Sequence, residues 1–116
     1  MIVRNVFEAN LEQVTAHKGN GKIRFCRPFD SSDFESPWHF VDFALIPPGT
    51  SVGLHRHGDN EEMYFILEGH AIMTVNDQER EVKPGDLILN RAGWTHGIRN
   101  EGAVDVKMLV VEVGIR

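Results

Sequence analysis

Turn signals recur at short intervals along this chain of 116 residues, and they limit the folds open to it. They are GNG at 19–21, DSSD at 30–33, PPG at 47–49, GDN at 58–60, ND at 76–77, PG at 84–85 and NEG at 100–102. The segments between them are short and rich in β-branched and aromatic residues, for example KIRFC, WHFVDFALI, MYFIL and VDVKMLVVEV. Short strands separated in this way predict an all-β sandwich or barrel. Only residues 5–16, with apolar residues spaced among polar ones, favour a helical turn or two.

Composition narrows the class of protein further. The length predicts a single domain, and a net charge of −5 disfavours a nucleic-acid partner. Cys26 is the only cysteine, so an intrachain disulfide is excluded and a reducing, cytoplasmic location is expected. The first residues lack the unbroken apolar stretch of a secretory signal, and no apolar run approaches the length of a membrane span. We therefore expect neither a nucleic-acid nor a membrane partner.

The stretch GLHRHGDNEEMYFILEG, residues 53–69, contains two alternating histidines followed closely by three acidic residues. His55 and His57 alternate, so on a strand both side chains face the same side. In the following strand, Glu62 shares a face with Tyr64 and Ile66, and the adjacent Glu61 takes the opposite face. Both faces are apolar, so alternation alone leaves open which glutamate points toward the histidines.

A third histidine, His96, lies in a second glycine-bounded segment, GDLILNRAGWTHGIRN. Three neutral imidazoles and one carboxylate suit Mn(II), Fe(II), Ni(II), Co(II) or Zn(II). Four protein ligands on a metal that prefers six leave two positions for water, substrate or dioxygen, as a catalytic metal requires. The alternatives are a metal that only stabilises the fold, or a site that has lost its metal.

At this point the sequence resembles the cupin superfamily. The first cupin motif is a glycine, five residues, His-x-His, three or four residues, Glu, six residues and Gly. It matches Gly49, His55, His57, Glu62 and Gly69, and the spacing to Gly69 selects Glu62 over Glu61.

The second cupin motif matches Gly85, Gly93, His96 and Asn100, but Arg91 stands where the family has proline. The resemblance covers roughly residues 38–113. It implies a double-stranded β-helix, or jelly-roll barrel, with residues 38–116 as the barrel and residues 1–37 as an N-terminal segment and first strands packed on it. It also implies that the metal ligands are His55, His57, Glu62 and His96, and Mn(II) and Fe(II) are the favoured ions.

Other side chains are candidates for roles around such a metal. Tyr64 lies on the face of Glu62 and could anchor a substrate or donate a proton, although a packed tyrosine is the simpler interpretation. His39 alternates with Val41 and Phe43 and becomes a candidate base if that face looks into the barrel, although a hydrogen-bonded core histidine is the simpler interpretation. For substrate binding, three residues are considered: Arg24 or Arg27, of which only one can point inward, and Trp94 as an aromatic wall.

Four further residues are expected to take no part in the chemistry. Arg56, between the two ligand histidines, should face away from the metal. His17 and His70 have no spaced partners and are predicted to lie at the surface, and Cys26 is predicted to be a small buried apolar residue.

The resemblance is closest to single-domain cupins described as oxalate-decarboxylase-like or sugar-isomerase-like. It favours a metal-dependent enzyme acting on a small organic molecule, first of all by decarboxylation or oxygenation of a small carboxylate. Two alternatives stay open. One is a non-catalytic cupin that binds a sugar or small acid, and the other is a metal-dependent isomerase, epimerase or lyase.

Residues 103–113, AVDVKMLVVEV, are apolar on both alternating sets, so this strand should be covered on both sides. Dimerisation would provide that cover and would also protect an exposed strand edge. We therefore predict a homodimer.

Overall fold

The structure is a computed structural model that describes residues 1–115, and it consists almost entirely of antiparallel strands. The elements are β1 (Glu12–Val14), β2 (Ile23–Asp30), the 3-10 turn η1 (Ser31–Asp33), β3 (Trp38–Ile46), β4 (Ser51–Arg56), β5 (Asn60–Glu68), β6 (Ala71–Val75), β7 (Gln78–Val82), β8 (Leu87–Asn90), β9 (Thr95–Arg99) and β10 (Val106–Gly114). The prediction of an all-β fold is confirmed.

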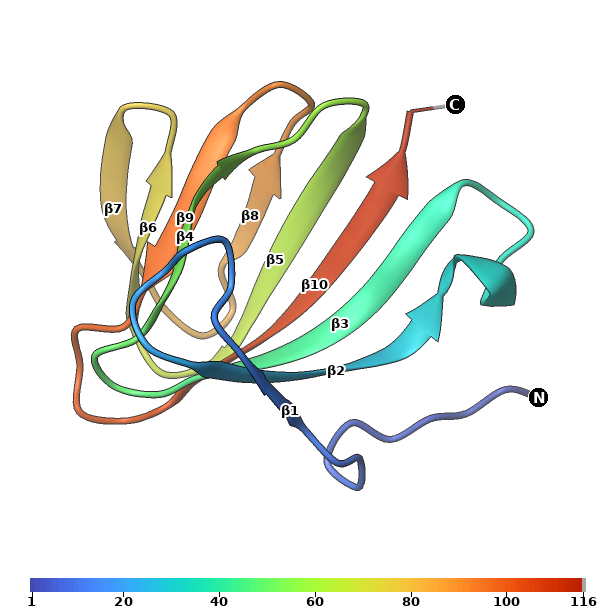
Figure 1. The fold of residues 1–116 in the computed structure, drawn as a ribbon, viewed down its shortest axis with the longest axis horizontal. Helices are drawn as coiled ribbons and strands as arrows, with labels where there is room; N and C mark the ends of the chain where they lie inside the picture. The colour runs from blue at the N-terminus through green and yellow to red at the C-terminus, as the bar shows by residue number, and fades with distance from the viewer. Residues whose placement is uncertain (116) are drawn as a thin grey trace.

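Two sheets make up the barrel (Figure 1). One has six strands in the order β1-β2-β3-β10-β5-β8, and the other has four in the order β4-β9-β6-β7. The chain crosses from one sheet to the other between β3 and β4 and again between β4 and β5, so residues close in sequence lie on facing walls. This crossing pattern is that of a jelly roll, as the sequence predicts.

The core lies between the two sheets and follows from strand alternation. Along β10, Val106, Met108 and Val110 are buried, while the residues between them are only partly covered. Ile98 of β9 and Ile46 of β3 meet them from other strands and are almost fully buried. Each such side chain contributes about 1.5–3 kcal/mol when it leaves water.

Strand β10 is not an edge strand, which corrects one premise of the dimer prediction. It pairs with β3 along one edge and with β5 along the other, from Val106 to Gly114. Its backbone groups are therefore satisfied within the chain, and dimerisation is not needed to protect them. What remains partly exposed is the outer face of the sheet that contains it.

The N-terminal region has no helix at residues 5–16 but only a single hydrogen-bonded turn, from Glu8 N to Asn5 O at 3.3 Å. Residues 12–14 form β1, which pairs with β2, and the following loop lies along the edge of β4. Two backbone bonds hold it there, from Gly53 N to Ala16 O at 3.0 Å and from Ser51 N to Asn20 O at 2.9 Å. Pairing with a neighbouring edge strand has overridden a weak local helical preference.

The only helical element in residues 1–115 is the 3-10 turn at residues 31–33. The described part of the chain thus contains no helix of the length and apolarity that crossing a membrane requires.

Candidate metal centre

The four residues predicted as ligands come together inside the barrel. His55 lies on β4, His57 just after it, His96 on the neighbouring β9, and Glu62 on β5 of the facing sheet. One donor atom from each lies within 4.8 Å of the others. His57, Glu62 and His96 are buried and His55 is partly covered, so the cluster is shielded from bulk water.

The spacing of the donor atoms fits a single metal ion. Nε2 of His96 is 3.0 Å from Oε1 of Glu62, and Nε2 of His57 is 3.2 Å from the same oxygen. Two donors about 2.1 Å from one ion, at roughly a right angle, would be about 3 Å apart. Although buried, Nε2 of His57 has no partner with hydrogen-bond geometry among residues 1–115. Such an atom is costly unless it meets a cation.

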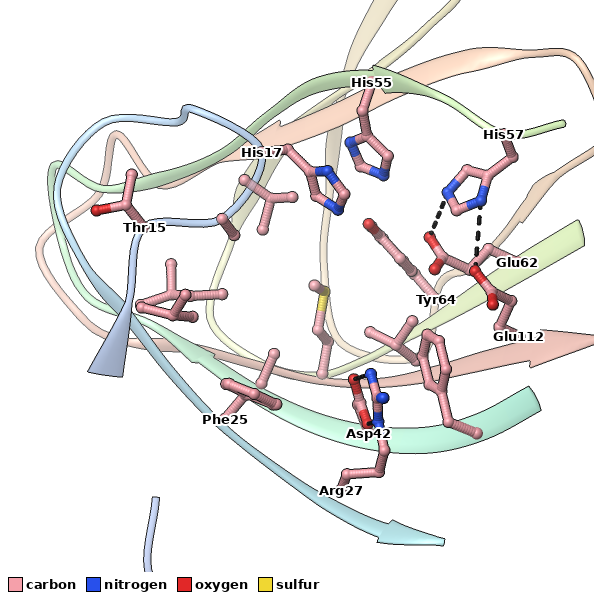
Figure 2. Close-up of a pocket in the computed structure, with 18 residues that line it drawn as sticks. Thr15, His17, Phe25, Arg27, Asp42, His55, His57, Glu62, Tyr64 and Glu112 are labelled. Atoms are coloured by element: carbon pink, nitrogen blue, oxygen red, sulfur yellow. Dashed lines mark hydrogen bonds and ion pairs between the residues drawn. The ribbon is translucent and has the colours of Figure 1, made fainter. Parts of the chain in front are cut away.

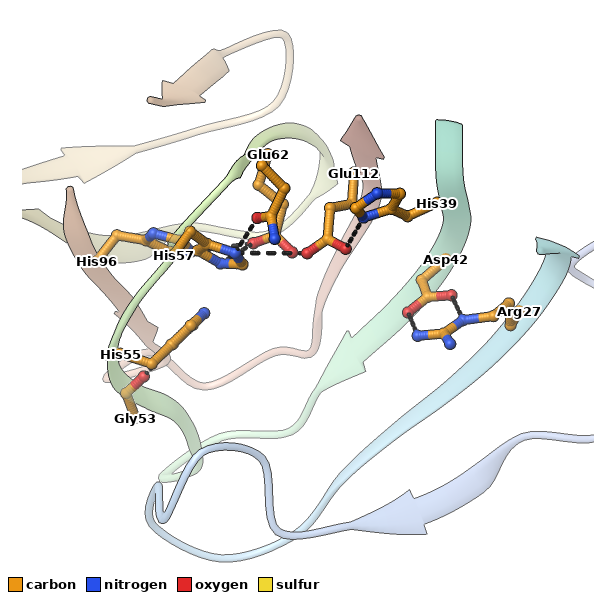
Figure 3. Close-up of polar contacts among 10 residues, drawn as sticks. Arg27, His39, Asp42, Gly53, His55, His57, Glu62, His96 and Glu112 are labelled. Carbon is orange, nitrogen blue, oxygen red and sulfur yellow. Dashed lines mark hydrogen bonds and ion pairs between the residues drawn. The ribbon is translucent and has the colours of Figure 1, made fainter. Parts of the chain in front are cut away.

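Neighbouring groups fix the orientation of two of the imidazoles (Figure 3). Nδ1 of His55 donates to the backbone carbonyl of Gly53 at 2.8 Å, which leaves Nε2 free to bind a metal. Nδ1 of His57 faces the side-chain oxygen of Asn60 and, at 3.4 Å, Oε1 of Glu112. Hydrogen bonds of this kind hold the ring of a ligand histidine in place and raise its basicity.

The protonation states also suit a cation. Burial lowers the pKa of His55 to about 4, so its imidazole is neutral at pH 7. Burial raises the pKa of Glu62, but the hydrogen bond from His96 and the charges of the nearby histidines outweigh it, and the net shift is downward. Neutral imidazoles and an ionised carboxylate are the forms that bind metal.

A cavity of about 430 Å³ extends from the ligands toward β2 and β3 (Figure 2). His55, His57 and Glu62 lie at one side of it, and Tyr64 lies on the wall beside them. Tyr64 is 2% exposed, and burial, followed by the charge of Glu62, raises its pKa well above the usual value. Its phenol therefore stays protonated and keeps a hydrogen that it can donate.

Of the two candidate arginines, Arg27 lines the cavity. Arg24 is exposed and is not part of the cavity wall. The side chain of Arg27 makes two hydrogen bonds to Asp42, at 2.8 and 3.1 Å, and its guanidinium lies 4.0 Å from the ring centre of Phe40. Arg27 is thus paired rather than free to hold a substrate carboxylate.

His39 does not line the cavity, because the inward face of β3 is the one that carries Phe40, Asp42 and Ala44. A register shift opposite His39, between Glu112 and Val113, nevertheless lets its Nδ1 reach Oε2 of Glu112 at 2.8 Å. His39 is therefore connected to the ligand His57 through Glu112.

Trp94 lies in a separate surface hollow, together with Glu61 and Arg91. It does not form an aromatic wall beside the ligands. It supports the site through its backbone instead, since its carbonyl accepts a hydrogen bond from the amide of His57 at 3.4 Å.

Three ionisable residues of the cavity wall were not predicted from the sequence as part of the site: Asp42, Glu112 and His17. Two of them carry a recognisable signal, because Asp42 and Glu112 are acidic residues on the inward-facing positions of β3 and β10. The third, His17, is exposed as predicted, yet its ring stacks on that of His55, with centroids 3.5 Å apart. No spacing signal in the sequence connects a loop residue with a strand far along the chain.

Replacing Glu112 by glutamine should weaken divalent metal binding by about 10–100-fold, because the carboxylate supports the ring of His57. Titration with Mn(II) or Zn(II) in competition with a chelator measures this change. Glu101→Gln, an exposed change of the same chemistry, is the matched control. Equal affinity of the E112Q variant and the unaltered protein would contradict a supporting role for Glu112.

Comparison with known proteins agrees with this fold. The cupin domain family matches residues 42–112, which include all four ligand candidates. An oxalate-binding protein of Thermotoga maritima is 39% identical over 112 residues, covering 96% of this chain and 92% of that protein. A 5-nitrosalicylic acid 1,2-dioxygenase of Bradyrhizobium is 34% identical over 76 residues, which cover 66% of this chain and 36% of the dioxygenase.

Among solved structures, a predicted oxalate decarboxylase of Thermotoga maritima superposes with a TM-score of 0.93. It is 29% identical, and the match covers 98% of this chain and 99% of that one. The fold is a β-barrel, and its largely buried cluster of His and Glu side chains could hold a metal ion. The chain belongs to the cupin family.

Proposed function

We propose that the protein is a cupin enzyme with one divalent metal ion that decarboxylates or oxygenates a small carboxylic acid. The observation that carries the proposal is the position of the ligand cluster. His55, His57 and Glu62 form part of the wall of a cavity large enough for a small organic molecule. A metal held there would have protein ligands on one side and open space on the other.

The bound ion would supply a Lewis acid or a redox centre next to the acid. The residues of the chain then have separate roles. The three imidazoles and Glu62 would hold the ion, and the side chains of the barrel wall would surround a molecule bound beside it. Tyr64 is protonated and beside the ligands, so its hydroxyl is placed to donate a hydrogen bond to an oxygen of the acid.

The relatives support a carboxylic acid as the ligand. The Thermotoga protein that matches nearly the whole chain is named for oxalate binding, and the Bradyrhizobium enzyme is named for oxidation of an aromatic acid. The match to the Bradyrhizobium enzyme covers only part of that enzyme's length. This match therefore supports the proposal mainly through the shared barrel.

Turnover by protein loaded separately with Mn(II), Fe(II) or Zn(II) tests the proposal. Oxalate and salicylate are the first substrates, and carbon dioxide release and oxygen consumption are followed together. We expect one of the redox-active ions to support turnover, with Fe(II) favoured for oxygenation and Mn(II) for decarboxylation. Tyr64→Phe should lower turnover while one metal ion remains bound. Absence of turnover with every ion would contradict an enzymatic role.

A second candidate, a binding protein without catalysis, is favoured by the name of the Thermotoga relative. It shares the first step, capture of the acid at the metal, and differs because the captured acid is released unchanged. An acid that binds and raises the melting temperature without being converted would favour this candidate.

We also propose that the protein is a cytoplasmic homodimer. Cys26 is a free thiol, as a reducing compartment allows. On the outer face of the six-stranded sheet, neighbouring strands align apolar side chains, with Leu89 opposite Met63 and Leu87 opposite Phe65. Leu87 is 60% exposed and Leu89 is 49% exposed, so this face offers an apolar surface to a second copy.

Light scattering at micromolar concentration should give the mass of two chains. The double variant Leu87→Lys, Leu89→Lys should give the mass of one, because it places charge on the apolar face. A single-chain mass for the unaltered protein would contradict the dimer.

A further inference from the structure

The wall of the ligand cavity is mostly apolar away from the metal ligands (Figure 2). Both sheets contribute to it. Strands β2, β3 and β10 supply most of the apolar side chains, and Val52 of β4 adds to them from the facing sheet. The apolar lining consists mainly of Ile23, Phe25, Ala44, Val52, Met108 and Val110. Oxalate consists only of two carboxylates, so it has no apolar part that could contact such a wall.

The size of the cavity leads to the same conclusion. Its volume is about 430 Å³, within the range of roughly 300–1,000 Å³ that encloses organic ligands of moderate size. Oxalate bound at the metal would leave most of this space to water. Water in contact with apolar side chains is displaced favourably by an apolar part of a ligand.

The charges of the cavity favour a ligand with one negative charge. Three carboxylates line it, Asp42, Glu62 and Glu112, and one guanidinium, that of Arg27, is paired with Asp42. A divalent ion beside Glu62 and Glu112 would bring the sum of these charges close to zero. A dianion would add repulsion that no free cationic side chain of the cavity wall offsets.

The ion pair of Arg27 and Asp42 lies on strands β2 and β3 (Figure 3), and both residues line the cavity. Burial raises the pKa of Asp42, while the hydrogen bonds and the charge of Arg27 oppose that rise. Because Asp42 accepts bonds from two nitrogens of Arg27, the pair presents little net charge to a ligand. The metal is thus left as the principal anchor for a carboxylate.

From these features we propose that the ligand is a monocarboxylic acid with an apolar body, of about the size of benzoate or hexanoate. This inference rests on the proposed function, in which the carboxylate binds at the metal. It adds that the apolar body lies against Phe25, Ala44 and Met108 and that this contact, rather than the carboxylate alone, selects the ligand.

Calorimetric binding of acetate, oxalate, hexanoate and benzoate to the Mn(II)-loaded protein tests the inference. Hexanoate and benzoate should bind at least about tenfold more tightly than acetate, since each buried methylene favours binding. They should also bind more tightly than oxalate. If oxalate binds best, or if the longer acids bind no better than acetate, the inference is overturned and the proposed function stands. If none of the four acids binds, the proposed function itself fails.

Two variants test whether the apolar body of the ligand contacts this wall. Ala44→Leu fills space at the apolar wall and should weaken hexanoate and benzoate binding at least about tenfold, with acetate binding unchanged. Ala9→Leu adds the same atoms at an exposed position and is the matched control. Should A44L fail to fold, Phe25→Ala removes part of the same wall and should weaken the longer acids alone. Unchanged binding of both acids in the folded variant would overturn the inference.

Discussion

Replacing His57 by alanine is expected to abolish stoichiometric binding of a divalent ion. Its Nε2 is buried, lies 3.2 Å from Oε1 of Glu62 and has no partner with hydrogen-bond geometry in residues 1–115. Loss of a supporting residue typically costs about 10–100-fold in metal affinity, so loss of a ligand should exceed about 100-fold. Metal analysis after dialysis should give about one ion per chain for the unaltered protein and almost none for H57A.

Arg56→Ala provides the control for this experiment. Arg56 is the immediate neighbour of His57 but is exposed and faces away from the cluster, as the alternation of β4 predicts. R56A should therefore keep its metal. Unchanged metal content in H57A would contradict the ligand assignment, and loss of metal in both variants would point to a general disturbance of the strand.

Replacing Gly53 by alanine is expected to give a large loss of stability. A Cβ atom on Gly53 would lie 2.1 Å from the carbonyl oxygen of His17. The atoms nearest to this Cβ all belong to the backbone, so no side-chain rotation relieves the clash. The loop from Ala16 to Asn20 would have to move and its bonds to β4 would weaken. We expect a loss of about 2–3 kcal/mol, equivalent to a fall of about 10 °C in melting temperature for a domain of this size.

Thermal unfolding of metal-free protein measures this effect without a contribution from the ion. Gly58→Ala is the matched control, because a Cβ atom on Gly58 meets no atom within 4 Å. Its melting temperature should change little. A melting temperature for G53A within about 3 °C of the unaltered protein would show that the loop is not held as tightly as its contacts indicate.

The fold was accessible from the sequence because it depends on local, periodic signals, and the motif spacing of the cupin resemblance selected the four residues that cluster in the structure. Turn residues mark the ends of the strands, and alternation puts His55 and His57 on one side. Alternation alone could not choose between Glu61 and Glu62. In the structure Glu62 is buried in the cluster, and Glu61 lies in the surface hollow with Trp94.

The remainder of the cavity was less accessible because it depends on which strands become neighbours. The sequence left open which face of β3 looks into the barrel, and the structure places His39 on the other face. The register shift that brings His39 to Glu112 leaves no local signature. The stacking of His17 on His55 requires the docking of an irregular loop onto β4. Contacts of this kind join residues far apart in the sequence and follow from the assembled barrel.

The departure from the second cupin motif at Arg91 does not prevent the turn before His96 from forming. Arg91 stands at the proline position, yet the turn still closes with a hydrogen bond from Trp94 N to Arg91 O at 3.1 Å. Gly93 within it has a φ of 79°, a value that glycine adopts without strain. The glycine rather than the proline therefore determines the shape of the turn that precedes His96.

The candidate ligands come from both sheets, with His55 and His96 on the four-stranded sheet and Glu62 on the six-stranded one. An ion bound by all three would be a cross-link through the middle of the barrel, between segments that the sequence separates widely. With Cys26 as its only cysteine, the chain cannot make such a link with an internal disulfide. A bound catalytic ion would also link the two sheets to each other. Binding or loss of the metal would therefore change the rigidity of the whole barrel.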